Sequence, residues 1–122
     1  ATPEEIAAFM DSAVWSRATP QDRRDAVSAE QAEETVALTP EEREAVEASL
    51  AGFDLRQQLP TVTVPTLVLS GREDRLNPPA AGEELARAIP GARFEVYENA
   101  GHMLPYEQAD RFVAEVAAFL AT

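Results

Sequence analysis

The 122-residue sequence contains no cysteine and only one histidine. The lack of cysteine excludes a disulfide framework, a thiolate nucleophile and every cysteine-based metal site. Because there is only one histidine, a multi-histidine metal site within this chain is also excluded. No apolar run approaches the roughly 18 residues needed to cross a bilayer. Positive charge is scarce, since 10 Lys and Arg face 22 Asp and Glu, for a net charge of −12. Nucleic acid and membrane surfaces are therefore poor partners, because both are anionic.

The residues that are present suffice for one domain with a moderate core, since 45% of them are hydrophobic. Residues 1–122 contain no pattern typical of a secretory signal, which a mature chain would have lost. Together with the lack of cysteine, this absence fits a bacterial cytoplasm. The chain opens with Ala1 and not Met, from which we expect processing or a fragment.

Composition changes near residue 52, and residues 1–51 are acidic and rich in Ala and Glu. Three segments there predict helix starts, because a Thr hydroxyl can cap free backbone N–H groups, Pro suits the first helical position, and an acidic residue follows three positions after the cap. They are Thr2–Glu5, Thr19–Asp22 and Thr39–Glu42. Ser28 is expected to cap a further short helix. This half is predicted to form short amphipathic helices that need another surface to cover them.

Residues 52–122 predict a strand, a helix, a second strand and a final helix. The predicted bounds are 66–71, 78–89, 92–97 and 106–120. This order predicts a parallel α/β unit with a right-handed crossover. The final helix carries an apolar stripe that we expect to be buried, formed by Phe112, Val113, Val116, Phe119 and Leu120. Because two parallel strands are too few to stand alone, we expect the rest of the sheet upstream of Ala1 or in a second chain.

Two loops of this unit carry candidate chemistry. Gly71–Asp74 follows the first strand and Asn99–His102 follows the second. Adjacent parallel strands end at the same edge of a sheet, so Asp74 and His102 can approach hydrogen-bonding distance. A carboxylate on one imidazole nitrogen orients a general base that acts through the other nitrogen. The residues alone leave a structural alternative open for each side chain. His102 would then be a loop histidine that makes a structural hydrogen bond, and Asp74 a turn or helix-cap residue.

The sequence of residues 52–122 resembles the C-terminal end of an α/β-hydrolase. The resemblance rests on VPTLVLSGRED (64–74), IPGA (89–92), NAGH (99–102) and the closing Phe119-Leu120, preceded by GFDLR (52–56). It implies a doubly wound, mostly parallel sheet of which 52–122 is the C-terminal strand-helix-strand-helix part. Residues 1–51 would be the helical cap or lid. In that family the triad acid follows the seventh strand and the histidine follows the eighth, which implies these roles for Asp74 and His102.

The chain departs from the family in lacking a G-x-S-x-G nucleophile elbow. The resemblance therefore implies an N-terminal half, in a separate chain or a missing segment, as the partner that supplies the nucleophile and the oxyanion hole. By itself the chain is expected to be inactive. Trp15, Leu76 and Met103 are candidates for the substrate pocket, with packing within the cap or the loops as the alternative. Arg72 and Glu73 are expected to be solvated turn charges.

The implied activity is hydrolysis of an ester, lactone or similar small-molecule bond, with no metal or organic cofactor. A nucleophilic aspartate in place of serine would make the enzyme a dehalogenase or epoxide hydrolase. A cofactor-free haloperoxidase or an acyltransferase could carry the same C-terminal pattern. The alternative from another class is a non-catalytic fragment or interaction subunit that docks through its exposed strand edge and cap helices.

Overall fold

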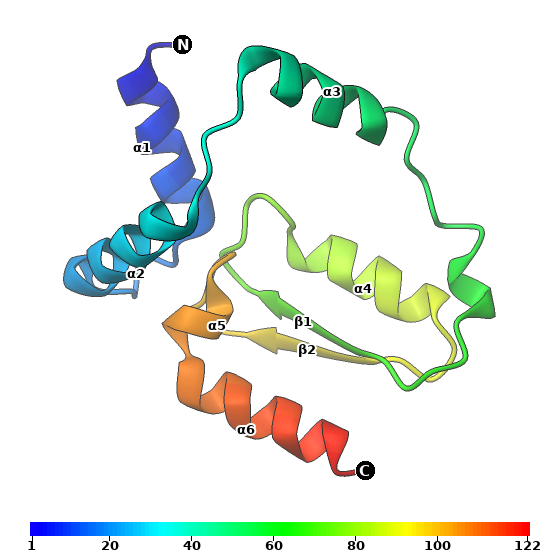
Figure 1. Cartoon of the computed structure of the whole chain (residues 1–122). Coiled ribbons are helices and arrows are strands. Elements are labelled where there is room, and N and C mark those ends of the chain that lie inside the picture. The colour runs from blue at the N-terminus through cyan, green and yellow to red at the C-terminus, as the bar shows by residue number, and fades with distance from the viewer.

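A computed structural model describes residues 1–122 as a mixed α/β chain with two parallel strands (Figure 1). α1 and α2 lie together at one side of the sheet, α3 stands apart above α4, and α4 and α6 flank the two strands. The elements are α1 (Pro3–Val14), α2 (Gln21–Glu34), α3 (Pro40–Leu50), the short 3-10 helix η1 (Leu59–Thr61), β1 (Leu67–Gly71), α4 (Pro79–Ala88), β2 (Arg93–Tyr97), α5 (Leu104–Glu107) and α6 (Ala109–Leu120).

Two of the three predicted helix starts have the expected caps. At α1 the Thr2 hydroxyl accepts from the Glu5 N–H, and the Glu5 carboxylate accepts from the Thr2 N–H. Thr39 caps α3 in the same way. The expectation for Thr19 is wrong, because α2 begins after Pro20 without a side-chain cap and the Thr19 hydroxyl donates elsewhere. Ser28 lies inside α2 and does not start a helix.

The predicted parallel pair is confirmed. β1 and β2 pair in a register that runs from Leu67 opposite Arg93 to Gly71 opposite Tyr97. α4 connects them and packs closely on β1, where Gly82 permits the approach, since a Cβ at this position would lie 2.3 Å from the Ser70 hydroxyl oxygen. The carboxyl ends of both strands therefore lie side by side, and each is followed by one of the candidate loops.

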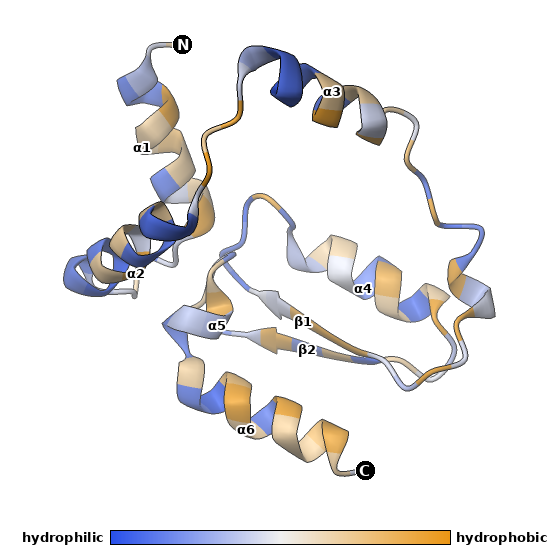
Figure 2. Cartoon of the chain, viewed as in Figure 1, coloured by the Kyte–Doolittle hydropathy of each residue, from blue (hydrophilic) through white to orange (hydrophobic).

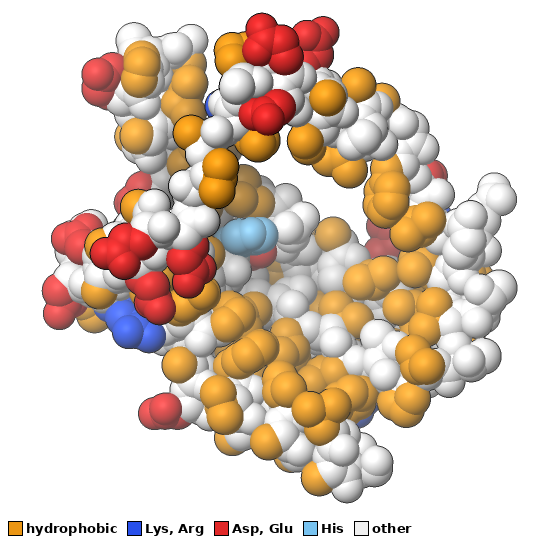
Figure 3. All heavy atoms as spheres, viewed as in Figure 1, with side chains coloured by type: hydrophobic (Ala, Val, Ile, Leu, Met, Phe, Trp, Pro, Cys, Tyr) orange, Lys and Arg blue, Asp and Glu red, His pale blue; other side chains and the backbone are white.

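The predicted final helix is two helices in the structure. Gln108 has φ −132° and ψ 55°, which is not helical, and it separates α5 from α6. The expected burial of the apolar stripe of α6 is confirmed only in part. Phe112, Val116 and Phe119 are half-buried, whereas Val113 and Leu120 are 63% and 75% exposed. Figure 2 shows this run of apolar residues on α6, and Figure 3 shows apolar side chains spread over the same face of the molecule.

The buried centre of the sheet lies beside the end of β2. Tyr97, Ala100 and Leu104 form a buried cluster, against which Leu69 and Phe112 pack. The Tyr97 ring is fully buried. Because Phe112 belongs to α6, this cluster holds α6 against the sheet even though most of the helix is exposed.

Two charged residues of α6 surround the Tyr97 side chain. The Tyr97 hydroxyl donates a hydrogen bond to the Glu115 carboxylate, and the Arg111 guanidinium lies 3.7 Å from the centre of the ring. Burial and then the bond to Glu115 raise the pKa of Tyr97 from 10.0 to about 12. Since the shift favours the protonated phenol, its contribution to stability is fully present below pH 10 and is lost as the pH rises towards 12.

This shift predicts a late-titrating phenol. The difference between the alkaline absorbance titrations of the protein and its Tyr97→Phe variant isolates the Tyr97 phenolate. We expect that difference to have a midpoint at about pH 12. A midpoint at the ordinary value of 10.0 would contradict the arrangement of Tyr97 and Glu115 described above.

Candidate functional site

The loops after β1 and β2 bring Asp74 and His102 together. His102 Nδ1 lies 3.0 Å from Asp74 Oδ2. An ionised carboxylate can only accept hydrogen bonds, so the imidazole must carry its proton on Nδ1 to make this bond. Nε2 is then left with a free lone pair, which is the state a general base requires.

Backbone groups hold the Asp74 carboxylate in place. Its side chain is buried, and its Oδ1 accepts hydrogen bonds from the N–H groups of Leu76 and Asn77, each at 2.9 Å. Because Oδ1 is occupied in this way, Oδ2 is directed at the imidazole. The same contacts explain why an aspartate suits this turn, since its side chain satisfies two successive backbone donors.

Close backbone contacts join the two loops to the end of α1. A Cβ at Gly71 would lie 2.2 Å from the Gly101 carbonyl oxygen, and one at Gly101 would lie 2.6 Å from the Val14 carbonyl oxygen. The His102 N–H donates to that same Val14 oxygen at 2.7 Å. Only glycine fits at these two positions, so the backbone that carries His102 is packed directly against the N-terminal helices.

Two glutamates tie residues 15–19, the loop between α1 and α2, to the site. The Glu73 carboxylate accepts from the Ser16 hydroxyl at 2.9 Å and from the Arg17 N–H at 2.8 Å. The expectation that Glu73 is a solvated turn charge is therefore wrong. Arg72 does lie at the surface, where it pairs with Glu98 at 2.8 Å.

Glu107 makes three such contacts, each at 2.7 Å. Its Oε1 accepts from the Ser16 N–H and the Thr19 hydroxyl, and its Oε2 accepts from the Gly101 N–H, beside His102. Sequence reasoning did not identify this residue. The two residues it joins in the 15–19 loop are 88 and 91 positions away, and no local pattern indicates the pairing.

Removing the Glu107 carboxylate is expected to weaken this junction strongly. Glu107→Ala leaves three donors without their partner, and hydrogen bonds to charged groups contribute roughly 1.5–3 kcal/mol each, not fully additively. We expect the free energy of unfolding to fall by about 2–4 kcal/mol in urea denaturation of the complete protein. Glu47→Ala on the exposed face of α3 is the matched control. Equal stability of the two variants would contradict the role given to Glu107.

A cavity of about 340 Å³ opens beside the Asp74–His102 pair. Its walls come from β1, α4 and the two loops, and the histidine side chain, pale blue in Figure 3, is visible in a hollow between the acidic N-terminal helices and the apolar face. The His102 side chain is 37% exposed while that of Asp74 is 8% exposed. A reactant can therefore reach the imidazole, whereas its carboxylate partner is shielded.

The three residues predicted to line a substrate pocket are not among those that line this cavity. Leu76 is 38% exposed, Met103 is half-buried, and Trp15 is buried against other hollows near α1. Their part in a substrate pocket stays a prediction. The chain holds no group of three or more acidic or histidine side chains arranged to hold a metal ion. None of its helices combines the length and apolar character required to span a membrane.

Comparison with known proteins gives one matching family profile and several relatives. The profile of the family described as "Serine aminopeptidase, S33" matches residues 14–109. A 2-hydroxy-6-oxononadienedioate/2-hydroxy-6-oxononatrienedioate hydrolase from a Pseudomonas species is 36% identical over 78 residues, which make up 64% of this chain and 28% of that hydrolase.

Two solved structures resemble nearly the whole chain. The enol-lactonase from Burkholderia xenovorans LB400 is 33% identical with a TM-score of 0.70, over 98% of this chain and 46% of that one. Est816, described as an N-acyl homoserine lactone degrading enzyme, is 27% identical with a TM-score of 0.75, over 98% of this chain and 52% of that one. The chain thus spans about half the length of these structures and about a quarter of the curated hydrolase.

Proposed function

Because the chain belongs to the α/β-hydrolase family described as serine aminopeptidase S33, we propose that Asp74 and His102 are the acid and general base of a catalytic triad. The single observation that carries the proposal is the 3.0 Å contact between His102 Nδ1 and a buried Asp74 carboxylate, at the adjacent ends of two parallel strands. The nucleophile, a serine in this proposal, belongs to a part of the enzyme outside residues 1–122.

The serines of this chain do not fit the role of nucleophile. None of the chain's five serines is hydrogen-bonded to His102. Ser16 is buried and bonded to Glu73, and Ser70 is buried beside Gly82 of α4. His102 Nε2, in contrast, has no partner within the chain, as expected if its partner is supplied from elsewhere.

In the proposed mechanism, His102 Nε2 takes the proton of the serine hydroxyl as the oxygen attacks the acyl carbon. It then returns that proton to the departing alkoxide oxygen and afterwards activates the water that releases the acyl group. Asp74 keeps the imidazole in the required tautomer and stabilises the imidazolium that forms in each step. Backbone N–H groups of the complementary half would stabilise the oxyanion.

The substrate class proposed is a carboxylic ester or lactone of a small molecule. Its support is that both structures described above, which resemble 98% of this chain, carry names of lactone-acting enzymes. Residues 1–51 are proposed to act as the cap, and residues 52–122 as the end of the hydrolase core. The exposed part of the apolar stripe of α6, Val113 and Leu120, and the two free sheet edges would be covered by the N-terminal half of the enzyme.

The substrate class is tested by assaying the complete protein with a nitrophenyl ester, an N-acyl homoserine lactone and an aminoacyl nitroanilide. We expect turnover of the ester or the lactone, and little or none of the anilide. Cleavage of the anilide alone would contradict the substrate class. Absence of turnover on all three would favour the alternative, a non-catalytic role for this chain.

A further inference from the structure

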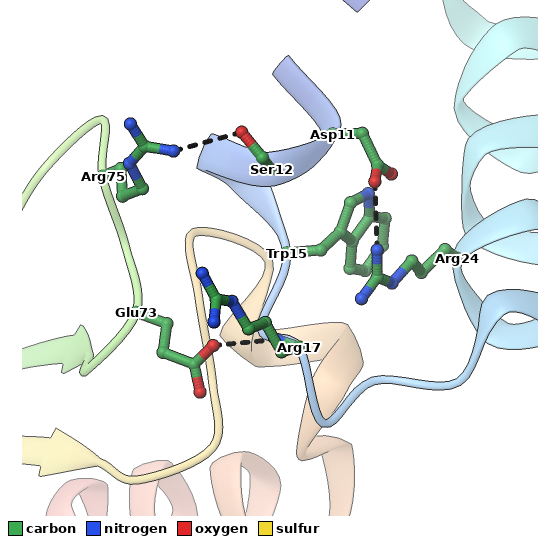
Figure 4. A pocket seen from close by; sticks show the side chains of 7 residues that line it. All are labelled: Asp11, Ser12, Trp15, Arg17, Arg24, Glu73 and Arg75. Atoms are coloured by element: carbon green, nitrogen blue, oxygen red, sulfur yellow. Dashed lines mark hydrogen bonds and ion pairs between the residues drawn. The ribbon is translucent and has the colours of Figure 1, made fainter. Parts of the chain in front are cut away.

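A second cavity, of about 570 Å³, lies where α1 and the 15–19 loop meet the loop after β1 (Figure 4). It shares no lining residue with the cavity beside His102. Six of its seven lining residues are polar or charged and three of them are arginines, although the chain as a whole carries a charge of −12. The lining residues are Asp11, Ser12, Trp15, Arg17, Arg24, Glu73 and Arg75.

Both carboxylates of this cavity already have partners. Asp11 pairs with Arg24 at 3.0 Å, and Arg24 also donates to two backbone carbonyl oxygens of the 15–19 loop. Glu73 accepts from the Ser16 hydroxyl and from the backbone N–H of Arg17. Neither carboxylate is therefore paired with the guanidinium group of Arg17 or Arg75.

The guanidinium groups of Arg17 and Arg75 are left without a carboxylate. No ion pair of the chain includes either of them. Arg75 donates to the Ser12 hydroxyl at 3.1 Å and lies over the Phe9 ring, while the Arg17 side chain makes no hydrogen bond. Both side chains line the cavity, and Figure 4 shows Arg75 directed at Ser12 and Arg17 lying near Glu73. Arg17 and Arg75 are both exposed, so an anion from solution can reach them.

We propose that this cavity binds a small oxyanion, a carboxylate or a phosphate group, between Arg17 and Arg75. Guanidinium groups present planar pairs of N–H donors that match the oxygens of both anions. The Ser12 hydroxyl supplies no donor to the anion, because it donates to the Phe9 carbonyl oxygen at 2.8 Å and accepts from Arg75. Arg17 lies in the 15–19 loop and Arg75 in the loop after β1, so the bound anion joins the N-terminal helices to the strand loops, alongside the contacts of Glu73 and Glu107. This site is separate from the proposed catalytic pair.

Trp15 offers a direct readout, because it is the single tryptophan of the chain and lines the cavity. The complete protein is titrated with inorganic phosphate or with malonate, at ionic strength held constant with chloride. Tryptophan fluorescence is recorded, with a Trp15→Phe variant to isolate the signal, and isothermal calorimetry measures the same binding independently. Neither readout depends on turnover, so the result is separate from that of the proposed activity.

We expect saturable binding of at least one of the two probes. Arg17→Gln and Arg75→Gln should each weaken it about tenfold, the loss typical of one charge-assisted contact. Arg87→Gln, on the exposed surface of α4, should leave it unchanged. Tighter binding of malonate identifies a carboxylate ligand, and tighter binding of phosphate identifies a phosphate ligand. No saturable binding by either method, or equal binding by all three variants, would overturn the proposal.

Discussion

Replacing Asp74 with asparagine is expected to lower kcat of the complete protein by roughly 10⁴-fold while the fold stays intact. The reason lies in how the two oxygens of Asp74 are used. Oδ1 accepts from two backbone N–H groups, and Oδ2 faces His102 Nδ1. An asparagine in this place keeps its carbonyl oxygen at the backbone donors, so its NH₂ group is turned towards the imidazole.

That orientation reverses the hydrogen bond to the histidine. The asparagine NH₂ donates to Nδ1, which forces the imidazole proton onto Nε2. Nε2 can then no longer take the proton of the nucleophile, and the base is lost without any change in the backbone. We therefore expect KM to change little and kcat to fall, as measured with the ester or lactone that the complete protein turns over.

The matched control for this variant is Asp110→Asn, at an exposed aspartate in the first turn of α6. It removes the same charge without a contact to His102. Its kcat should remain within about twofold of the unsubstituted protein, since surface substitutions have small effects. Equal activity of the Asp74 and Asp110 variants would contradict the role assigned to Asp74.

His102→Ala should have an effect at least as large, about 10⁴-fold or more in kcat, because it removes the proton acceptor itself. The imidazole makes its one side-chain hydrogen bond with Asp74, and the adjacent cavity is open to solvent. Water can therefore reach the carboxylate that loses its partner, and we expect little change in thermal stability. An unfolding temperature well below that of the unsubstituted protein would show that His102 also has a structural role.

The double variant of Asp74 and His102 tests whether the two residues act as one unit. If Asp74 works only through the imidazole, adding Asp74→Asn to His102→Ala lowers kcat no further. Independent roles would instead make the two losses multiply. The comparison requires an assay sensitive enough to measure the residual turnover of the single variants.

The pairing of Asp74 with His102, and the strand-helix-strand unit that carries both residues, could be predicted from the sequence because both depend on local patterns. An apolar strand, a Pro-initiated helix and a second strand fix the parallel order, and this order brings Asp74 and His102 to the same edge. The capping boxes of α1 and α3 are equally local, since each lies within four consecutive residues.

What could not be predicted depends on contacts between distant residues. Thr19 has the sequence of a helix cap, but its hydroxyl donates to Glu107, 88 positions away. Glu73 looks like a turn charge because Ser16 and Arg17 are far from it in the chain. The apolar stripe of α6 indicates burial, yet two of its residues, Val113 and Leu120, stay exposed in this chain. In each case a tertiary partner decides the outcome, and local propensity carries no information about that partner.

The most direct test of the proposed catalytic role is covalent labelling of the complete protein with a fluorophosphonate, followed by peptide mapping. The serine oxygen displaces fluoride from phosphorus, so the label marks a serine that a neighbouring base has activated. We expect one adduct, on a serine outside residues 1–122, with labelling at least about 10³-fold slower in the His102→Ala variant. A label on Ser12, Ser16, Ser28, Ser49 or Ser70, or labelling at the same rate without His102, would contradict this assignment of the catalytic site.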